Sequence, residues 1–247
     1  MDPDPPPPPR ENLVHRAEHA AEHAEQHLPS WLKPGDPENR WPVLLALIAA
    51  IVFQRTIPER YTLVPRWPLI SLEIALVLVL LLINPVRLTR STVTGKYVSW
   101  VLLAAIAVDN TLSAFDLDRH IVSGEVSNNP AVLLGSGAAI FVTNIIVFGI
   151  WFWELDRGGP FARGAGENPY PDFMFPQMSG VPSQVARPDW RPTFVDYLYV
   201  SITNVMAFSP TDTMPLSPRA KLLMTVQAVV AVSTLVLVIA RAVNVLH

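Results

Sequence analysis

Five mostly apolar stretches limit the folds that are open to this chain. A helix of about 20 mostly apolar residues crosses the roughly 30 Å hydrocarbon core of a bilayer. The strongest stretch, residues 68–86, contains the run LEIALVLVLLLI, and Glu73 is its single charged residue. The other four are residues 41–57, 97–115, 131–153 and 222–246. We therefore predict an all-α integral membrane protein with about five transmembrane helices, in multi-pass topology and in the plasma membrane.

The composition agrees with this class and argues against others. Half of the residues are apolar, 16% are charged and the mean hydropathy is +0.31, which is too apolar for an ordinary water-facing surface. The formal net charge of -3 excludes a broadly cationic nucleic-acid binder. The chain has no cysteine, so it cannot form a disulfide or a thiolate metal site. None of the common catalytic or nucleotide-binding motifs occurs, so we expect neither an enzyme nor a cofactor.

The first forty residues form a polar region ahead of the apolar stretches. The opening MDPDPPPPPR predicts an extended, solvated tail, and the following Ala- and Glu-rich segment predicts a helix. Four histidines recur in that helix at a spacing of four: His15, His19, His23 and His27. Neighbours at this spacing share a helix face, so pairs of them could bind a divalent metal or respond to pH. A solvated polar helix with no specific ligand explains the same pattern.

Polar side chains inside the apolar stretches are candidate functional residues, because burying them in lipid is costly. Asp109 lies in the third stretch, Asn144 in the fourth and Gln227 in the fifth. Two interpretations remain open for Asp109 and Asn144. They either form hydrogen bonds between helices or take part in transport or proton movement.

A shorter apolar segment, residues 193–208, lies between the last two stretches. Its sequence TFVDYLYVSITNVMAF is apolar enough to enter a membrane but too short and polar to cross it comfortably. We predict a re-entrant helix, which requires surrounding protein because backbone at membrane depth must have its polar groups satisfied. Residues 158–191, ahead of it, are rich in Gly and Pro and predict a long loop.

The order of residues from Asp196 onward resembles the pore module of the potassium channel superfamily. In that family an acidic residue, aromatics and a Thr-rich pore helix precede the filter sequence T-V-G-Y-G-D, and a proline and a basic residue follow it. The positions that match are Asp196, Tyr197, Tyr199, Thr203, Asn204, Asp212, Pro215 and Lys221. The resemblance covers residues 131–247. It implies an outer helix, a pore helix, a filter loop and an inner helix that assemble as a homo-oligomer around a path for a monovalent cation.

The filter itself departs from the family pattern. At the positions of T-V-G-Y-G the chain has Ala207, Phe208, Ser209, Pro210 and Thr211. A potassium filter uses glycines for the unusual backbone angles that aim its carbonyls at the axis, and proline fixes φ and lacks an N–H. We therefore predict a non-standard filter with weakly selective cation conduction, or a channel scaffold that does not conduct. An ordinary turn, in which Ser217 caps the following helix and Pro218 begins it, explains the same residues.

We divide the chain into a tail and histidine-bearing helix (residues 1–40), a three-span membrane domain (41–130) and the pore-module-like region (131–247). The primary hypothesis is an oligomeric, channel-like protein of the lipid bilayer that does not bind nucleic acid. One alternative is an adaptor subunit whose contact surfaces are the N-terminal helix and the 158–191 loop. The other is a small-solute or proton-coupled transporter that uses Asp109 and Asn144. The basic residues after the second stretch and the acidic ones after the third place the N-terminus in the cytoplasm.

Overall fold

The computed structural model describes residues 28–36, 38–39, 41–59, 66–83, 93–125, 129–179, 187–206 and 212–246. The four predicted metal-binding or pH-sensing histidines, His15, His19, His23 and His27, lie outside these ranges. In chain order the elements are α2 (Trp41–Thr56), α3 (Arg66–Ile83), α4 (Val93–Ser123), α5 (Pro130–Leu155), η2 (Asp156–Gly158), α6 (Pro160–Ala165), β1 (Phe173–Met174), η3 (Pro176–Met178), α7 (Phe194–Met206), β2 (Met214–Pro215) and α8 (Pro218–Leu246). The protein is mostly helical, which confirms the all-α class.

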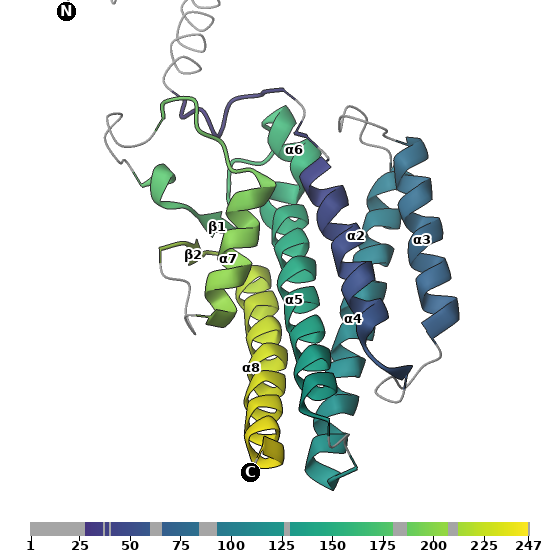
Figure 1. Ribbon diagram of the computed structural model, residues 1–247. Helices are drawn as coiled ribbons and strands as arrows, with labels where there is room; N and C mark the ends of the chain where they lie inside the picture. Colours follow the sequence, from purple (N-terminus) through teal and green to yellow (C-terminus); the bar gives the residue numbers. More distant parts are fainter. Residues whose placement is uncertain are drawn as a thin grey trace, which may run out of the picture.

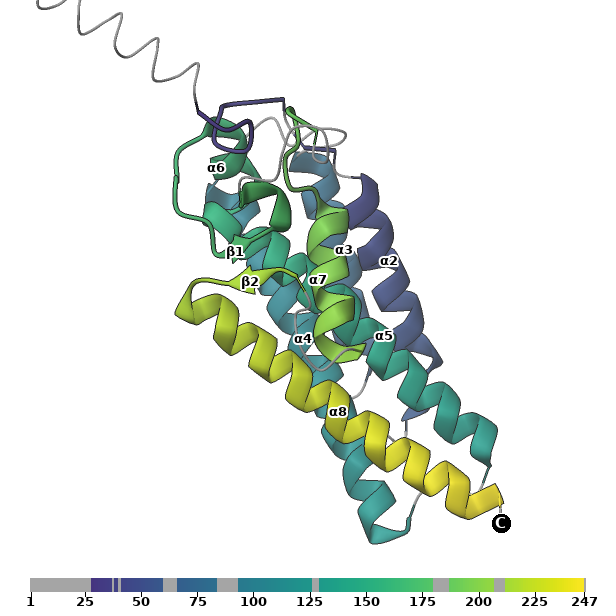
Figure 2. The same ribbon diagram turned by 90° about the vertical axis from the view of Figure 1, so that its left-hand side faces the viewer.

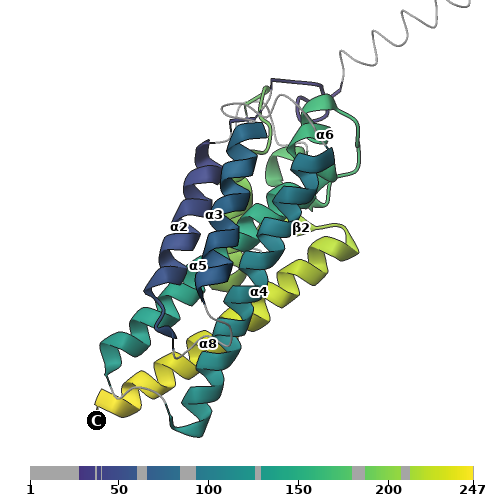
Figure 3. The ribbon, with the colours of Figure 1, turned by 90° about the vertical axis from the view of Figure 1, so that its right-hand side faces the viewer.

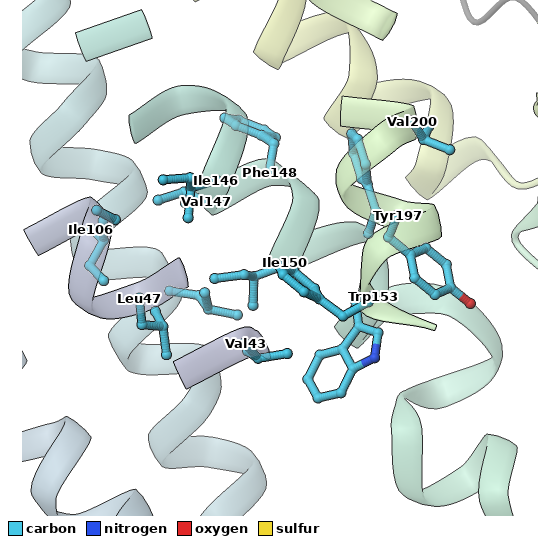
Figure 4. Packing of buried hydrophobic residues seen from close by; sticks show 14 of the residues in the cluster. Val43, Leu47, Ile106, Ile146, Val147, Phe148, Ile150, Trp153, Tyr197 and Val200 are labelled. Atoms are coloured by element: carbon cyan, nitrogen blue, oxygen red, sulfur yellow. The ribbon is translucent and has the colours of Figure 1, made fainter. Parts of the chain in front are cut away.

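The long helices form a bundle around α5 (Figure 1). Helix α5 packs against α2 and α4 and also against α7 and α8, while α3 packs on the outside against α4. Figure 3 shows α3 and α4 from this outer side, and Figure 2 shows α8 crossing the bundle obliquely. Figure 4 shows the core between α2, α4, α5 and α7, with labelled side chains that include Val43, Ile106, Ile150 and Val200.

Three segments of the described chain are long and apolar enough to cross a membrane. They are Gly95–Ser123, Pro130–Ala165 and Pro218–Asn244, and α2 and α3 supply shorter apolar helices. Each of the five stretches singled out in the sequence corresponds to a helix over most of its described residues. This fits a membrane protein, and the count of five spans remains a prediction.

Helix α4 runs further than its apolar stretch, which ends at residue 115. Leu117 is fully buried against the lower part of the bundle, and His120 Nδ1 lies 3.7 Å from the Asp116 carboxylate one turn earlier. The helix ends just before Gly124, which has a φ of 77° and is followed by residues outside the described part. Tertiary burial and an i, i+4 pair thus extend the helix beyond the point where the hydropathy falls.

The connection predicted as a loop contains short regular elements. After α5 the backbone reverses through Gly158 and Gly159, both with positive φ, and Pro160 occupies the start of α6. Gly166 then ends α6 in the left-handed conformation, with a φ of 70°. Further along, β1 pairs antiparallel with β2, with Phe173 opposite Pro215 and Met174 opposite Met214. Glycine and proline therefore start and stop short elements here instead of preventing them.

Helix α7 packs beside α8 (Figure 2), and the described chain resumes at residue 212, just ahead of β2. Tyr197 in the first turn of α7 packs against Phe173 of β1, with 6.2 Å between ring centroids. Phe173 in turn pairs with Pro215, just ahead of α8. Phe173 therefore links the first turn of α7 to β2. Helix α8 starts just after β2, with Ser217 Oγ accepting from Ala220 N at 3.1 Å, which confirms the predicted cap.

Candidate functional site

A network of buried polar side chains holds α7 between α5 and α8. The Gln227 amide donates to Ser201 Oγ at 2.6 Å and to Ser201 O at 3.1 Å. Asn204 Nδ2 donates to Gln227 Oε1 and to Met224 O, both at 2.9 Å. Ser201 Oγ donates to Ile145 O on α5 at 2.6 Å. We call Ser201, Asn204 and Gln227 the α7 clamp, because each hydrogen bond ties α7 to a neighbouring long helix.

The clamp brings together residues that the sequence nominated for different reasons. Asn204 was predicted as part of the pore helix and Gln227 as an intramembrane polar residue, and the two side chains are hydrogen-bonded. Ser201 was not nominated, although it lies three residues before Asn204 and so on the same side of the helix. The amide groups of the clamp are largely occupied by one another, so their first role is to position α7.

The other predicted residues of α7 serve the helix itself. Asp196 Oδ2 accepts from Thr193 N at 2.7 Å and from Thr193 Oγ1 at 2.8 Å, which caps the start of α7. The Thr203 hydroxyl donates to carbonyls of the preceding turn, Tyr199 O and Val200 O. Asp212 is exposed ahead of β2. The predicted filter residues Ala207, Phe208, Ser209, Pro210 and Thr211 lie outside the described residues.

The C-terminal end of α7 lies level with inner turns of α5 and α8. Gln227, which contacts Asn204, is nine residues beyond the start of α8, or about 14 Å along that helix. Ile145, which contacts Ser201, is ten residues before the end of α5, or about 15 Å along it. The last carbonyls of a helix carry a partial negative charge that favours cations. The orientation of α7 therefore places this charge at a level between the two ends of α5 and α8.

A second polar cluster lies at the end of the bundle where α7 starts. Arg163 lies on α6, and its guanidinium donates to Glu38 Oε1 at 2.9 and 3.2 Å. The same group donates to Trp153 O at 2.6 Å and Asp156 O at 2.8 Å, which are carbonyls at the end of α5. Glu38 also accepts from Trp153 Nε1 at 2.6 Å. Arg163 thus binds the segment before α2 to the terminus of α5.

Asp156 links this cluster to α7. Its side chain, which is fully buried, accepts from the Tyr197 hydroxyl at 2.6 Å and from the backbone N–H of Asp172 and Phe173 at 2.7 and 3.3 Å. Burial raises the pKa of the Tyr197 hydroxyl well above its ordinary value, and the neighbouring Asp156 carboxylate acts in the same direction. Tyr197 therefore stays protonated and donates this hydrogen bond. Tyr197 matches an aromatic of the pore-helix pattern, and in this structure it anchors the start of α7.

The backbone reverses direction after α5 at Arg157, which is fully buried. Its φ of 54° lies in the left-handed region, which costs a non-glycine residue about 1 kcal/mol or more. Asp172 Oδ2 accepts from its backbone N–H at 3.1 Å, and the guanidinium donates to the carbonyls of Asn168 and Trp31. Arg157 was not nominated from the sequence. The signal was the Gly-Gly-Pro that follows, which demands a sharp reversal.

A third cluster lies between α2, α3 and α4, away from α7. Gln54 Nε2 donates to Asp109 Oδ2 at 2.9 Å across the interface of α2 and α4. Glu73 on α3 interacts electrostatically with Asp109 and lies beside the same Gln54 side chain. Asn144 on α5, which was predicted together with Asp109, is buried, and its side-chain oxygen and nitrogen have no hydrogen-bond partner among the described residues. Asp109 is thus hydrogen-bonded across the interface of α2 and α4 in the structure, whereas Asn144 is not part of this contact.

The described residues contain no group of three or more His, Asp and Glu side chains suited to a metal ion. A scan against protein-family models, a search of curated proteins and a search of solved structures each returned no match to this chain. The sequence and the geometry above therefore carry the argument for function.

Proposed function

We propose that the protein is a channel-like membrane protein in which α5, α7 and α8 form a pore module with α7 as a re-entrant half-helix. The observation that supports this proposal is that α7 packs beside α8 while Pro215, ahead of α8, pairs with Phe173, which contacts Tyr197 in the first turn of α7. Short helices that end inside a bundle are a recurring way to place helix termini at the depth where ions bind.

The permeant species under this proposal is a monovalent cation. The C-terminal carbonyls of α7 carry partial negative charge at a level between the ends of α5 and α8, and Asp212 adds an exposed acidic side chain after the loop. The loop between them lacks the glycines of a potassium filter, so the conduction is weakly selective. A single copy of α5, α7 and α8 cannot surround an axis, so we propose a homo-oligomer.

The membrane topology under this proposal has five spans: α2, α3, α4, α5 and α8. The two shorter helices cross with the help of their flanking residues, and exposed apolar side chains along α8, such as Leu222, Val229 and Val236, face lipid or another copy. The N-terminus lies in the cytoplasm, so α7 enters from the cytoplasmic side of the plasma membrane. The lipid bilayer is the main environment of the protein.

The absence of cysteine makes a direct test of this topology simple. Three exposed positions suit single cysteine substitutions: Asp189 and Leu216, which flank α7, and Val122, near the far end of α4. A membrane-impermeant maleimide should label Asp189→Cys and Leu216→Cys from one side and Val122→Cys from the other. Labelling of the two flanking cysteines from opposite sides would mean that α7 crosses the membrane, and the re-entrant proposal would fail.

Conduction is tested with the full-length protein reconstituted in liposomes. We expect potassium and sodium flux above that of protein-free vesicles, and a severalfold decrease on Asp212→Asn. Asp189→Asn is the matched control, because it removes the same charge from an exposed position at the same end of the bundle. Ion flux no higher than in protein-free vesicles, or equal effects of the two substitutions on the flux, would contradict a conducting module that depends on Asp212.

A further inference from the structure

Helices α4, α5 and α8 bury five polar side chains that have unpaired hydrogen-bonding atoms. The residues are Asn110 and Ser113 on α4, Thr143 and Asn144 on α5, and Thr234 on α8, and each is at most 2% exposed. Six atoms have no hydrogen-bond partner among the described residues: Asn110 Oδ1, Ser113 Oγ, Thr143 Oγ1, Asn144 Oδ1 and Nδ2, and Thr234 Oγ1. Native proteins pair nearly all buried polar groups with protein or with water, because an unpaired one is costly. These six atoms are therefore available to a small polar molecule.

The polar residues of α5 and α8 lie on facing sides of these two helices. A Cβ at Gly137 of α5 would lie 2.8 Å from Val238 Cγ1 of α8, so these two positions are in contact. Asn144 is seven residues, or two turns, beyond Gly137 and shares its face of α5. Thr234 is four residues before Val238 and shares its face of α8. Because the helices run antiparallel (Figure 1), both steps lead in the same direction, and Asn144 and Thr234 lie within about one turn of each other.

Helix α4 supplies the third side of the same region. Leu117 of α4 belongs to one buried cluster with Ile140 of α5. Ser113 is four residues before Leu117 and Asn110 is seven before it, so both share its face of α4. Thr143 follows Ile140 by three residues and lies one turn further along α5. Because α4 and α5 are antiparallel (Figure 1), these steps also lead in one direction, which brings the polar residues of the three helices together. We call the five polar residues of α4, α5 and α8 the polar seam.

The polar seam offers uncharged groups that both donate and accept hydrogen bonds. Its hydroxyls do either, its amide oxygens accept, and Asn144 Nδ2 only donates. A metal cation binds oxygens and would leave this amide donor unpaired, whereas a water molecule pairs with donors and acceptors alike. A buried water typically makes about three hydrogen bonds to groups that are otherwise unpaired. The six unpaired atoms thus match about two water molecules.

We propose that the polar seam is an internal water-binding site between α4, α5 and α8. Asn144 and Thr234 lie near the middle of α5 and α8, so the site hydrates the interior of the bundle far from both helix ends. Asn144 binds water through both of its polar atoms instead of joining two helices directly. The site needs neither α7 nor assembly around an axis, so it stands or falls independently of the proposed pore module.

Radiolytic footprinting tests the site in the full-length protein in lipid nanodiscs. Brief X-ray irradiation converts water into hydroxyl radicals, and mass spectrometry identifies the side chains that these radicals oxidise. Ile140 is 1% exposed and lies one turn from Asn144. It should be oxidised severalfold faster than Leu102, a fully buried aliphatic residue of α4 that belongs to the other apolar cluster. Equally slow oxidation of Ile140 and Leu102 would overturn the proposal.

A substitution and a change of salt assign the oxidation to water in the polar seam. Asn144→Leu should lower the oxidation rate of Ile140 severalfold, because two of the six binding atoms are lost. Thr111→Val is the matched control and should leave the rate unchanged, since the Thr111 hydroxyl already donates to Ala107 O at 2.7 Å within α4. Equal effects of the two substitutions would contradict the site. Sodium chloride in place of choline chloride at constant ionic strength should also leave the rate unchanged, and a decrease would assign the site to a cation and overturn the proposal. If a variant folds poorly, the wild-type comparison of Ile140 with Leu102 decides.

Discussion

Replacing Gln227 by leucine tests whether the α7 clamp holds the half-helix in place. Gln227 makes three hydrogen bonds to α7, at 2.6 and 3.1 Å to Ser201 and at 2.9 Å from Asn204. At ~0.6 kcal/mol for each polar contact between membrane helices, these bonds contribute about 2 kcal/mol. Leucine is close to glutamine in size, so the loss is mainly that of the hydrogen bonds. We expect the population of undocked α7 to rise about 30-fold, since 1.36 kcal/mol corresponds to a factor of ten.

The assay is the rate at which a maleimide labels a single cysteine at Val205, a buried position on α7 that becomes accessible when the helix undocks. The rate should rise about 30-fold on Gln227→Leu if labelling follows the undocked population. Thr225→Val is the matched control on α8, because the Thr225 hydroxyl is exposed and donates only within its own helix, to Lys221 O at 2.8 Å. An increase below roughly threefold, or the same increase in the control, would refute the view that this network holds α7.

Two further substitutions test the end cluster and the packing of the bundle. Arg163→Leu should lower the free energy of unfolding by about 3–5 kcal/mol, because it leaves the Glu38 carboxylate and the Asp156 carbonyl without their cationic donor. Thermal denaturation in detergent measures this loss. A free energy of unfolding within about 1 kcal/mol of the wild-type value would mean that the cluster does not stabilise the fold. Gly137→Ala should cost about 1–3 kcal/mol, because its Cβ would lie 2.8 Å from a side chain of α8. Gly135→Ala is its control, with nothing within 4 Å of the added Cβ, and equal effects would show that helix packing is not responsible.

The helices themselves were largely predictable. Apolar stretches of about 20 residues have few stable conformations other than a helix in a bilayer, and the predicted starts and ends of α5 and α8 lie within four residues of the observed ones. The start of α8 was also predictable from Ser217 and Pro218, which are local capping signals. The extension of α4 to Ser123 was not, because it depends on the burial of Leu117 against other helices.

The candidate sites were only partly predictable. Asp109 and Gln227 were nominated because polar residues in apolar stretches are costly to bury, and Asn204 because it matches the pore-helix pattern. All three take part in interhelical polar contacts in the structure. Glu73 was noticed only as the single charge of its stretch. Its electrostatic interaction with Asp109 depends on how α3 packs against α4, which no local pattern specifies.

The amino-acid order alone is enough to specify a mostly helical chain suited to a membrane, because hydropathy over some twenty residues and local caps act within single helices. Contacts between distant residues arise only when the helices pack. Glu38 meets Arg163 and Ser201 meets Ile145 across long separations in the chain. Such pairs depend on the relative rotation and depth of whole helices, which are set by the summed packing of the bundle and not by any one segment.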